Sequence, residues 1–439
     1  MELADSPPRD PPVCHLPGEL LIKILQHVPR AQRVQLSEVC RRWCCLLRAP
    51  SPLWETLSVS GRAESSARAA ALWSLLRWLE PRAPAVRTLH YLCFAEPLDN
   101  PDHLVGSWLV CLLGTLGRGL HMLVCAGSDR EIALVCELAE SLAPGLQRLV
   151  LNQGPTLPCG SLALASLTAL RSLSISLCET NRYVAVADRY HFPACLTHLA
   201  LNMAHVNGDR LCRGLGGALA ALTRLNSLNL QGVLGLGAGC GALSALEAAH
   251  FEACTFDHGW SAGFAMALSA LRSLAFTASP LSQADLSYLP RLPSLEAFTC
   301  DCVFRTTDLM VLPALPPSLT FLDLAHFNVP AIAPAIAALP KLVECRLAEN
   351  RMTELPASFS RLTALQTLSV RLNSGLDLGG VLGLTALVEL NATQCGTLAL
   401  PEAHLILDTL PRLRRVLLRG SRPLNAESWD AWAELPIEL

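Results

Sequence analysis

The feature that most limits the fold of this chain is a leucine pattern that returns along most of its length. The pattern is L-x-x-L-x-L, and neighbouring copies start mostly about 22–26 residues apart, a period typical of stacked repeats. Well-matched copies begin at Leu146, Leu170, Leu196, Leu225, Leu246, Leu271, Leu295, Leu319, Leu342, Leu365, Leu387 and Leu413, and looser copies begin at Val86 and Leu120. Such a period predicts a stack of small units rather than one globular core.

Each copy predicts a short strand. The leucines of its L-x-L core point inward, and the residues between them point to the opposite, concave face. Parallel stacking pairs the strand backbones, and the rest of each copy returns on the convex side as a mixture of helix and turn. In one copy, Asn350 is placed to hydrogen-bond backbone where the strand ends, whereas most copies carry Ala, Cys, Ser or Gly there. The expected fold class is therefore an α/β solenoid.

The pattern resembles the leucine-rich-repeat family across about Val86–Gly420, which implies a leucine-rich-repeat horseshoe. The end units of such a stack need covering, because they would otherwise expose their core. Ser65–Glu80 predicts an amphipathic helix that caps the front. Asn425–Leu435 begins with an N-cap residue and carries two tryptophans, so we expect it to cover the back.

The composition fits a solenoid. Hydrophobic residues make up 51% of the chain and charged residues 16%, against about 25% charged in typical soluble domains. The net charge of −3 offers no basic field, so we expect neither a nucleic acid nor a membrane as partner. The uncharged stretch Leu225–Leu246 is long enough to cross a bilayer, but its polar residues and repeat spacing favour solenoid core.

The 18 cysteines predict neither a zinc site nor a disulfide framework. They form no C-x-x-C pair, and the polar, proline-rich segment after Met1 does not resemble a secretory signal. We therefore expect free thiols that act as small core hydrophobes in a reducing compartment.

The front of the chain, Leu16–Leu57, does not repeat. Leu20, Ile24 and Val28 fall on one helical face with Leu21 and Leu25 at its flank, and Pro17 and Glu19 suit the first helical turn. A second amphipathic run carries Leu36, Val39, Cys40, Trp43 and Leu47, and Leu53 and Trp54 follow a turn. Three short elements form a marginal core that a partner usually completes.

The order of these motifs resembles the F-box: "LPGELLIKILQHV", then "VCRRW", then "SPLWETL". One departure is the polar segment Pro29–Gln35 before the second helix. The resemblance implies docking on the Skp adaptor and, through it, on the cullin of an SCF-type ubiquitin ligase. It implies that the core and adaptor-facing surface consist of Leu16, Pro17, Leu20, Ile24, Val39, Cys40, Trp43, Leu53 and Trp54. We expect Trp54 to be the main binding anchor, since large aromatics dominate interfaces. The alternative is a small helical cap packed on the solenoid.

These patterns predict five regions. They are a disordered tail at 1–13, an F-box at 14–58, a linker and N-terminal cap helix at 59–85, leucine-rich repeats at 86–420 and a C-terminal cap at 421–439.

The concave positions change in character along the array. Early copies carry small or polar residues there, whereas later copies carry charged and bulkier ones. We predict a binding surface for a protein substrate formed by Phe321, Asp323, Glu344, Arg346, Arg371, Glu389 and Arg415. The alternative for each of them is the ordinary solvated face of a parallel sheet.

No catalytic constellation was found, so we expect no enzyme activity, no metal and no cofactor. The sequence predicts a non-catalytic substrate-recognition subunit of an SCF-type ligase, in the cytoplasm, the nucleus or both. A protein-interaction scaffold that uses the same two modules outside a ligase is the alternative.

Overall fold

A computed structural model of the chain falls into two compact units, Met1–Cys178 and Glu179–Leu439. The structure describes residues 17–29, 32–33, 36, 41–49, 52–61, 66–93, 102–127, 129–152, 162–176, 190–203, 215–233, 235–257, 264, 268–281, 283–301, 314–327, 334–395, 397–398, 400–418 and 422–423. Several expectations fall outside these residues: the tail at 1–13, the cap helix at Asn425–Leu435, and Leu16, Val39 and Cys40.

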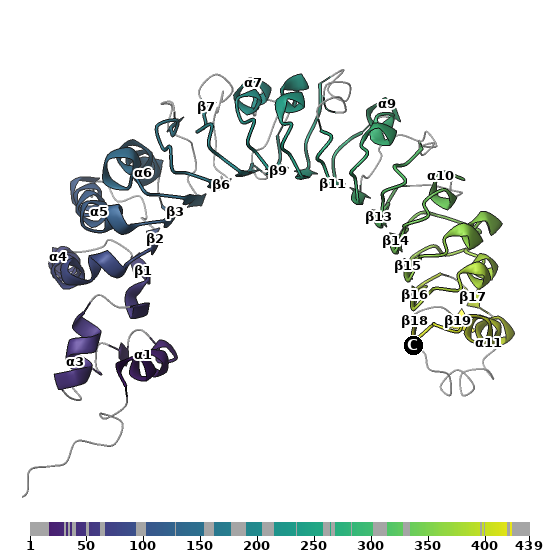
Figure 1. Cartoon of the computed structure of the whole chain (residues 1–439), viewed down its shortest axis with the longest axis horizontal. Helices are drawn as coiled ribbons and strands as arrows, with labels where there is room; N and C mark the ends of the chain where they lie inside the picture. The colour runs from purple at the N-terminus through teal and green to yellow at the C-terminus, as the bar shows by residue number, and fades with distance from the viewer. Residues whose placement is uncertain are drawn as a thin grey trace, which may run out of the picture. The chain divides into compact units, whose positions relative to one another are not determined.

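The first unit holds a small helical module followed by a parallel sheet. The module consists of α1 (Gly18–Gln26), α3 (Arg41–Arg48) and η3 (Pro52–Trp54). The strands are β1 (Thr56–Gly61), β2 (Thr88–Cys93), β3 (Met122–Ala126), β4 (Arg148–Asn152), β5 (Leu162–Ala163) and β6 (Ser172–Ser176). Between them run α4 (Ser66–Leu79), η4 (Glu80–Ala85), α5 (Asp102–Leu116), η5 (Gly117–Gly119) and α6 (Asp129–Leu142). The helices α4, α5 and α6 lie on one side of the strands (Figure 1).

The second unit is a longer parallel array. Its strands are β7 (Tyr190–His191), β8 (His198–Asn202), β9 (Ser227–Gln231), β10 (Ala248–Glu252), β11 (Ser273–Thr277), β12 (Ala297–Asp301), β13 (Phe321–Asp323), β14 (Glu344–Arg346), β15 (Thr367–Ser369), β16 (Glu389–Asn391), β17 (Thr397–Leu398), β18 (Arg415–Leu417) and β19 (Arg422–Pro423). The strands β8 to β16 and then β18 pair with their neighbours in that order, and β17 pairs with β19. The strands of each of these pairs run parallel to each other.

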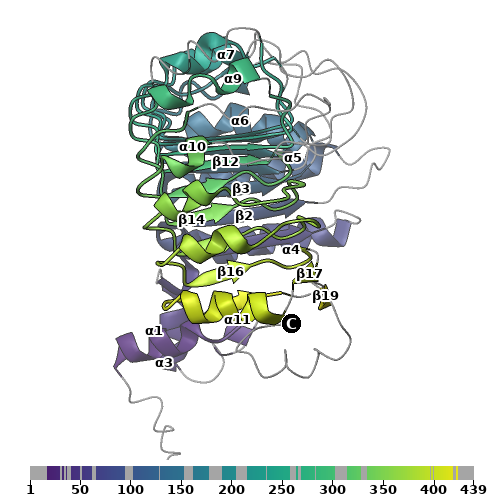
Figure 2. The ribbon, with the colours of Figure 1, turned by 90° about the vertical axis from the view of Figure 1, so that its right-hand side faces the viewer.

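The return segments of the second unit are short. They include α7 (Leu215–Ala220), η7 (Ala238–Ala242), α9 (Gln283–Leu286), η8 (Leu289–Arg291), α10 (Pro334–Ala337), η9 (Ala357–Arg361), η10 (Gly379–Gly383) and α11 (Leu400–Thr409). They lie on the opposite side of the array from the free strand face (Figures 1 and 2). This mixture of helix and turn confirms the expected irregular convex side.

The leucine pattern locates the strands. A strand begins two residues after each predicted copy start, for example β9 after Leu225 and β14 after Leu342. Burial alternates along most of these strands, so that Leu228 and Leu230 of β9 are buried while Asn229 between them is exposed, whereas β3 is buried on both faces from its second residue. The prediction of an α/β solenoid with inward-pointing leucines is confirmed.

The sheet begins earlier than the leucine copies indicated. Strand β1 pairs in parallel with β2 in the register Thr56↔Thr88. Trp54 occupies the position that the first leucine takes in other copies, because Leu57 and Val59 follow it with the same spacing. The segment 59–85, expected to be a linker and a capping helix, therefore contains the end of β1 and the return helix α4.

Buried polar groups close the turns after the late strands. Asn350 donates from Nδ2 to the carbonyls of Leu324 and Ala348 at 2.7 and 3.1 Å, which confirms its expected role. Asn373 donates to Leu347 and Val370 at 2.9 and 2.6 Å. The residues before these asparagines, Glu349 and Leu372, have a positive φ, as do their counterparts in other repeats, which are Ala253, Ala278, His326 and Gln394. The turn that follows each of these strands therefore marks the end of the strand's exposed face.

The uncharged stretch Leu225–Leu246 contains β9 and the 3-10 helix η7. Both Leu225 and Leu246 are buried in the repeat core. Within the described ranges, no helix combines the length and the apolar character that a membrane crossing requires.

Candidate interaction surfaces

Helix α1 buries one apolar face and exposes another. Leu21 and Leu25 are fully buried, whereas Leu20 is 45% exposed and Ile24 is 44% exposed. One helical turn separates Leu20 from Ile24, so the two side chains lie on the same face and form what we call the apolar stripe. Pro17, whose carbonyl accepts the N–H groups of Leu20 and Leu21, is exposed beside this face. The structure thus shows which apolar residues of α1 are exposed and which belong to the core, whereas the sequence predicted both kinds as one set.

The module core is a compact cluster of six residues. It contains Leu21, Leu25, Trp43, Leu47, Leu53 and Trp54, with Leu36 and Trp78 packed against it. Trp54 is only 6% exposed, and its indole N–H donates to the Leu47 carbonyl at 3.1 Å. The ring of Trp54, which we expected to be the main binding anchor, fills the core, and the apolar stripe is what α1 leaves exposed. Whether Trp54 contributes to adaptor binding stays a prediction.

A buried arginine closes the end of α1. Arg33 is 7% exposed and donates to three carbonyls, those of Gln26 at 2.8 Å, Val28 at 2.8 Å and Leu53 at 2.9 Å. It comes from the polar segment Pro29–Gln35, where the chain departs from the usual F-box pattern. A guanidinium is well suited to this position because its donors fan out in a plane. The sequence analysis missed Arg33, since a single arginine in a polar loop carries no periodic signal.

A second buried arginine joins the module to the first repeat. Arg82 of η4 is 4% exposed, and it donates from Nε to the Leu47 carbonyl at 3.1 Å and from Nη1 to the Trp78 carbonyl. Its guanidinium lies 4.0 Å from the Trp78 ring centroid, and Trp78 packs edge-to-face on Trp54 at 4.9 Å. The module therefore packs directly on the return segment of β1.

The predicted substrate-binding residues lie together on the strand side of the second unit. Phe321 and Asp323 lie on β13, Glu344 and Arg346 on β14, Glu389 on β16 and Arg415 on β18, and Arg371 lies two residues after β15. The register places Phe321 beside Glu344 and Asp323 beside Arg346. Glu389 lies beside Arg415 in the same way. Whether a substrate contacts them stays a prediction.

Ion pairs link these residues across strands. Arg346 contacts Glu344 at 2.7 Å and Asp323 at 3.8 Å, and it lies over the Phe321 ring at 5.2 Å from the centroid. Arg371 contacts Glu349 at 3.6 Å, and Arg415 contacts Glu389 at 3.2 Å. We call this surface the charged face; it consists of Asp301, Phe321, Asp323, His326, Glu344, Arg346, Glu349, Arg371, Glu389 and Arg415.

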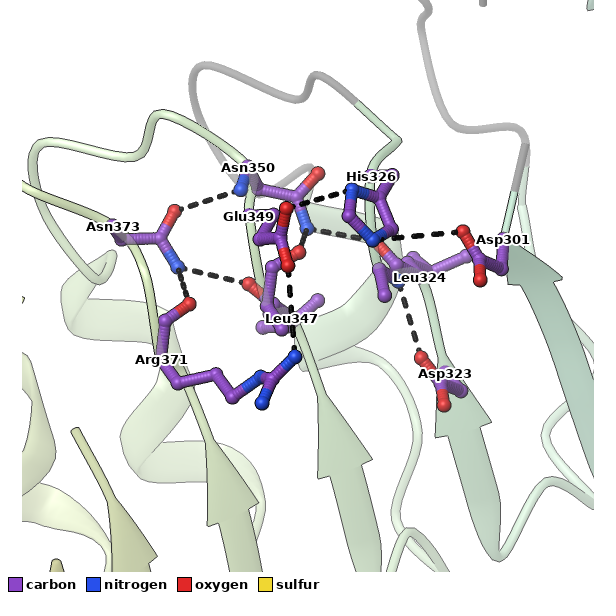
Figure 3. A network of polar contacts seen from close by, with 11 residues as sticks. Asp301, Asp323, Leu324, His326, Leu347, Glu349, Asn350, Arg371 and Asn373 are labelled. Carbon is purple, nitrogen blue, oxygen red and sulfur yellow. Dashed lines mark hydrogen bonds and ion pairs between the residues drawn. The ribbon is translucent and has the colours of Figure 1, made fainter. Parts of the chain in front are cut away.

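His326 is a member of the charged face that the sequence analysis missed. Its Nδ1 lies 3.0 Å from Glu349, and its Nε2 lies 4.0 Å from Asp301 (Figure 3). Glu349 also contacts Arg371, so a chain of contacts runs from Asp301 on β12 through His326 and Glu349 to Arg371 in the repeat of β15. The repeat spacing could have identified His326, because this residue occupies the same position in its turn as Glu349 does in the next repeat.

Asp323 is the least exposed carboxylate of the charged face. Burial raises the pKa of its carboxyl above the ordinary value, and the neighbouring carboxylates Asp301 and Glu344 raise it further. The Ala325 N–H, which donates to Asp323 Oδ1 at 3.1 Å, and Arg346 act in the opposite direction. The surroundings of Asp323 therefore disfavour its negative charge.

The strand faces of earlier repeats differ from the charged face. The corresponding positions of β4 hold Arg148, Val150 and Asn152, and β6 presents three serines. His198 and His250 contact threonine hydroxyls, Thr197 at 2.9 Å and Thr277 at 3.3 Å. Among the residues that the structure describes, no three His, Cys, Asp or Glu side chains are grouped so as to hold a metal ion.

Comparison with protein families supports the predicted resemblance of the N-terminal module to the F-box. Residues 13–60 match the family model described as F-box-like. A comparison with the sequences of curated proteins gave no match.

Solved structures resemble the repeats. Toll, in the Toll–Spatzle complex from Drosophila, is 14% identical with a TM-score of 0.55, and the match covers 88% of this chain but 50% of that one. An internalin (inlF) from Listeria monocytogenes is 14% identical over 96% of this chain and 93% of its own, with a TM-score of 0.44. TLR13, in its complex with ssRNA13, is 18% identical over 84% and 58%, with a TM-score of 0.45. At such identities the likeness to Toll shows the fold alone.

Proposed function

We propose that this protein, which joins an F-box-like domain to a leucine-rich-repeat solenoid, is the substrate-recognition subunit of an SCF-type ubiquitin ligase. F-box domains generally bind Skp-type adaptors, and the repeats supply an extended surface for a protein partner. The protein is a receptor without catalytic residues of its own. It acts by proximity, because holding a substrate beside the transferred ubiquitin raises their effective concentration.

The observation that carries this proposal is the apolar stripe on α1. Leu20 and Ile24 are two of only five large hydrophobic residues that are exposed among those the structure describes. They lie one turn apart on a helix within residues 13–60, the part that matches the F-box-like model. Exposed apolar groups side by side in a small domain favour a protein interface. The adaptor is the partner that the domain type suggests.

The stripe is tested by substituting both of its residues. Leu20→Asp with Ile24→Asp is expected to weaken capture of the full chain by a recombinant Skp adaptor at least about 30-fold, because two desolvated contacts are lost. Leu405→Asp is the matched control, since Leu405 is 51% exposed on α11 and lies outside the F-box-like domain. Equal capture of the double variant and the wild type would contradict the proposal.

The same capture experiment separates a ligase subunit from a scaffold. A complex that contains the adaptor and a cullin supports the ligase function, and it is expected from the cytoplasm, the nucleus or both. A complex with the adaptor alone supports the alternative, a scaffold that uses the F-box-like domain outside a ligase. No capture of either partner by the wild type refutes both.

A further inference from the structure

The charged face is electrically divided along the array. Of the residues that make up the charged face, four carboxylates, Asp301, Asp323, Glu344 and Glu349, and one arginine, Arg346, belong to the repeats of β12–β14. Over β15–β18 the balance reverses, because Arg371 and Arg415 outnumber Glu389. We call these two parts the acidic half and the basic half of the charged face. The division follows from the register, which places the strands side by side in sequence order.

Each cationic side chain of the acidic half already contacts two carboxylates, and Glu349 is also contacted by Arg371. Arg346 contacts both Glu344 and Asp323, and its guanidinium also lies against the Phe321 ring. His326, between Asp301 and Glu349, carries charge only when protonated. Burial raises the pKa of Asp323, and the carboxylates of Asp301 and Glu344 raise it further, whereas Arg346 lowers it. A cation from another molecule beside these carboxylates would favour their charged forms.

The basic half projects its arginines outward. The side chains of Arg371 and Arg415 are each 51% exposed, while their partners Glu349 and Glu389 are 33% and 34% exposed. Each of these arginines is therefore held by a carboxylate while about half of its side chain is exposed to solvent. β15, the first strand of the basic half, carries only the small side chains Thr367 and Ser369 on the strand face.

We propose that the charged face binds an extended segment of a protein partner that carries cationic side chains over β12–β14 and carboxylates over β15–β18. This inference rests on the proposed function, since it names the kind of substrate segment that the repeats receive. The segment crosses the strands, so that its two charged clusters meet the two halves in a fixed order. Charge order, rather than net charge, distinguishes this partner from others.

The spacing of the strands sets the length of the segment. Neighbouring strands lie roughly 4.8 Å apart, so the centres of the two halves, near β13 and β16, are separated by about 14 Å. An extended chain covers about 3.3 Å per residue, so about four residues separate the two charged clusters.

Defined peptides test the charge order. The block peptide has three lysines, the spacer Gly-Ser-Gly-Ser and three glutamates; the alternating peptide has the same composition with lysine and glutamate alternating. A lysine peptide carries serines in place of the glutamates. Binding of each fluorescein-labelled peptide to the full chain is measured by anisotropy. The block peptide is expected to bind at least tenfold more tightly than either of the others. Equal affinity for block and alternating peptides, or for block and lysine peptides, overturns the proposal.

Variants locate the binding. Asp323→Lys with Glu344→Lys is expected to abolish the preference for the block peptide, and the milder pair Asp323→Asn with Glu344→Gln to reduce it. The matched control, Glu247→Lys with Glu354→Lys, makes the same charge change at exposed positions outside the charged face. An equal loss of preference in the control overturns the placement. Circular dichroism confirms that each variant is folded.

Adaptor capture on the same preparations separates the two possible failures. If the block preference is absent while the adaptor is still captured through the apolar stripe, the charge-order inference fails and the proposed function stands. If the block preference is present while the adaptor is not captured, the charged face binds as proposed and the ligase function fails.

Discussion

The F-box-like domain and the charged face use arginine and leucine in opposite ways. In the domain and where the first repeat packs on it, Arg33 and Arg82 are buried and bonded to carbonyls, while Leu20 and Ile24 of the domain are exposed. On the charged face, arginines are half exposed and paired with carboxylates, while the leucines of the same strands are buried. Residue type therefore does not indicate which side chains stabilise the fold and which are available to a partner. Burial and the kind of hydrogen-bond acceptor decide it.

The largest expected effect tests the two kinds of arginine directly. Arg82→Ala is expected to lower the free energy of unfolding by about 4 kcal/mol, because it leaves buried carbonyls unpaired and removes the contact with Trp78. Arg346→Ala is the control, and it is expected to cost about 1 kcal/mol or less, as exposed ion pairs do. Urea unfolding followed by tryptophan fluorescence and circular dichroism measures both. Similar losses for the two variants would break the comparison.

Adjacent leucines of α1 provide the next test. Leu21→Ala is expected to destabilise the protein by about 3 kcal/mol, since it opens a cavity in the module core. Leu20→Ala is expected to change stability by about 0.5 kcal/mol at most, because its side chain is already exposed. Thermal unfolding of the two variants side by side measures the difference. A large loss for Leu20→Ala would mean that the apolar stripe serves the fold.

A buried polar residue beside the charged face extends the comparison. Asn373→Ala is expected to cost about 2 kcal/mol, because its Oδ1 accepts the N–H groups of Asn350 and Met352, and its Nδ2 donates to three carbonyls. Asn391→Ala is the control: the Asn391 side chain accepts one N–H, that of Thr393 at 3.2 Å, and lies at a partly exposed position. Urea midpoints that fall equally in both would refute burial as the deciding factor.

The smallest expected effect concerns pH. Because the pKa of Asp323 is higher in the folded protein than its ordinary 3.8, the folded state binds this proton more tightly than the unfolded state does. The free energy of unfolding therefore falls as pH rises from about 3.8 through the raised pKa. Asp323→Asn lacks this fall, so the variant is expected to gain stability relative to the wild type over that window. Urea midpoints of both proteins across pH measure the gain, and a relative loss would contradict it.

Much of the fold could be predicted because its signal is periodic. The leucine spacing located the strands of the main sheet from β2 to β18, although not the two-residue strands β5, β7 and β17. Alternation along the strands identified most residues of the charged face, but not His326 in a turn. The first strand was missed because Trp54 replaces the leucine that starts other copies. The roles of Arg33 and Arg82 were missed because their partners are carbonyls distant in sequence, as in the bond from Arg33 to Leu53 across 20 residues.

By itself, the sequence determined that the chain forms repeats, which residues lie inside them, and that a non-repeating helical module precedes them. All three results depend on local spacing, which each segment carries within itself. Only the tertiary structure decided that Leu20 and Ile24 are exposed while Leu21 and Leu25 are buried, and that the charges of β12–β18 divide into two halves. Those facts depend on which side of a helix meets its neighbours and which strands lie side by side, and such contacts join residues far apart in the chain.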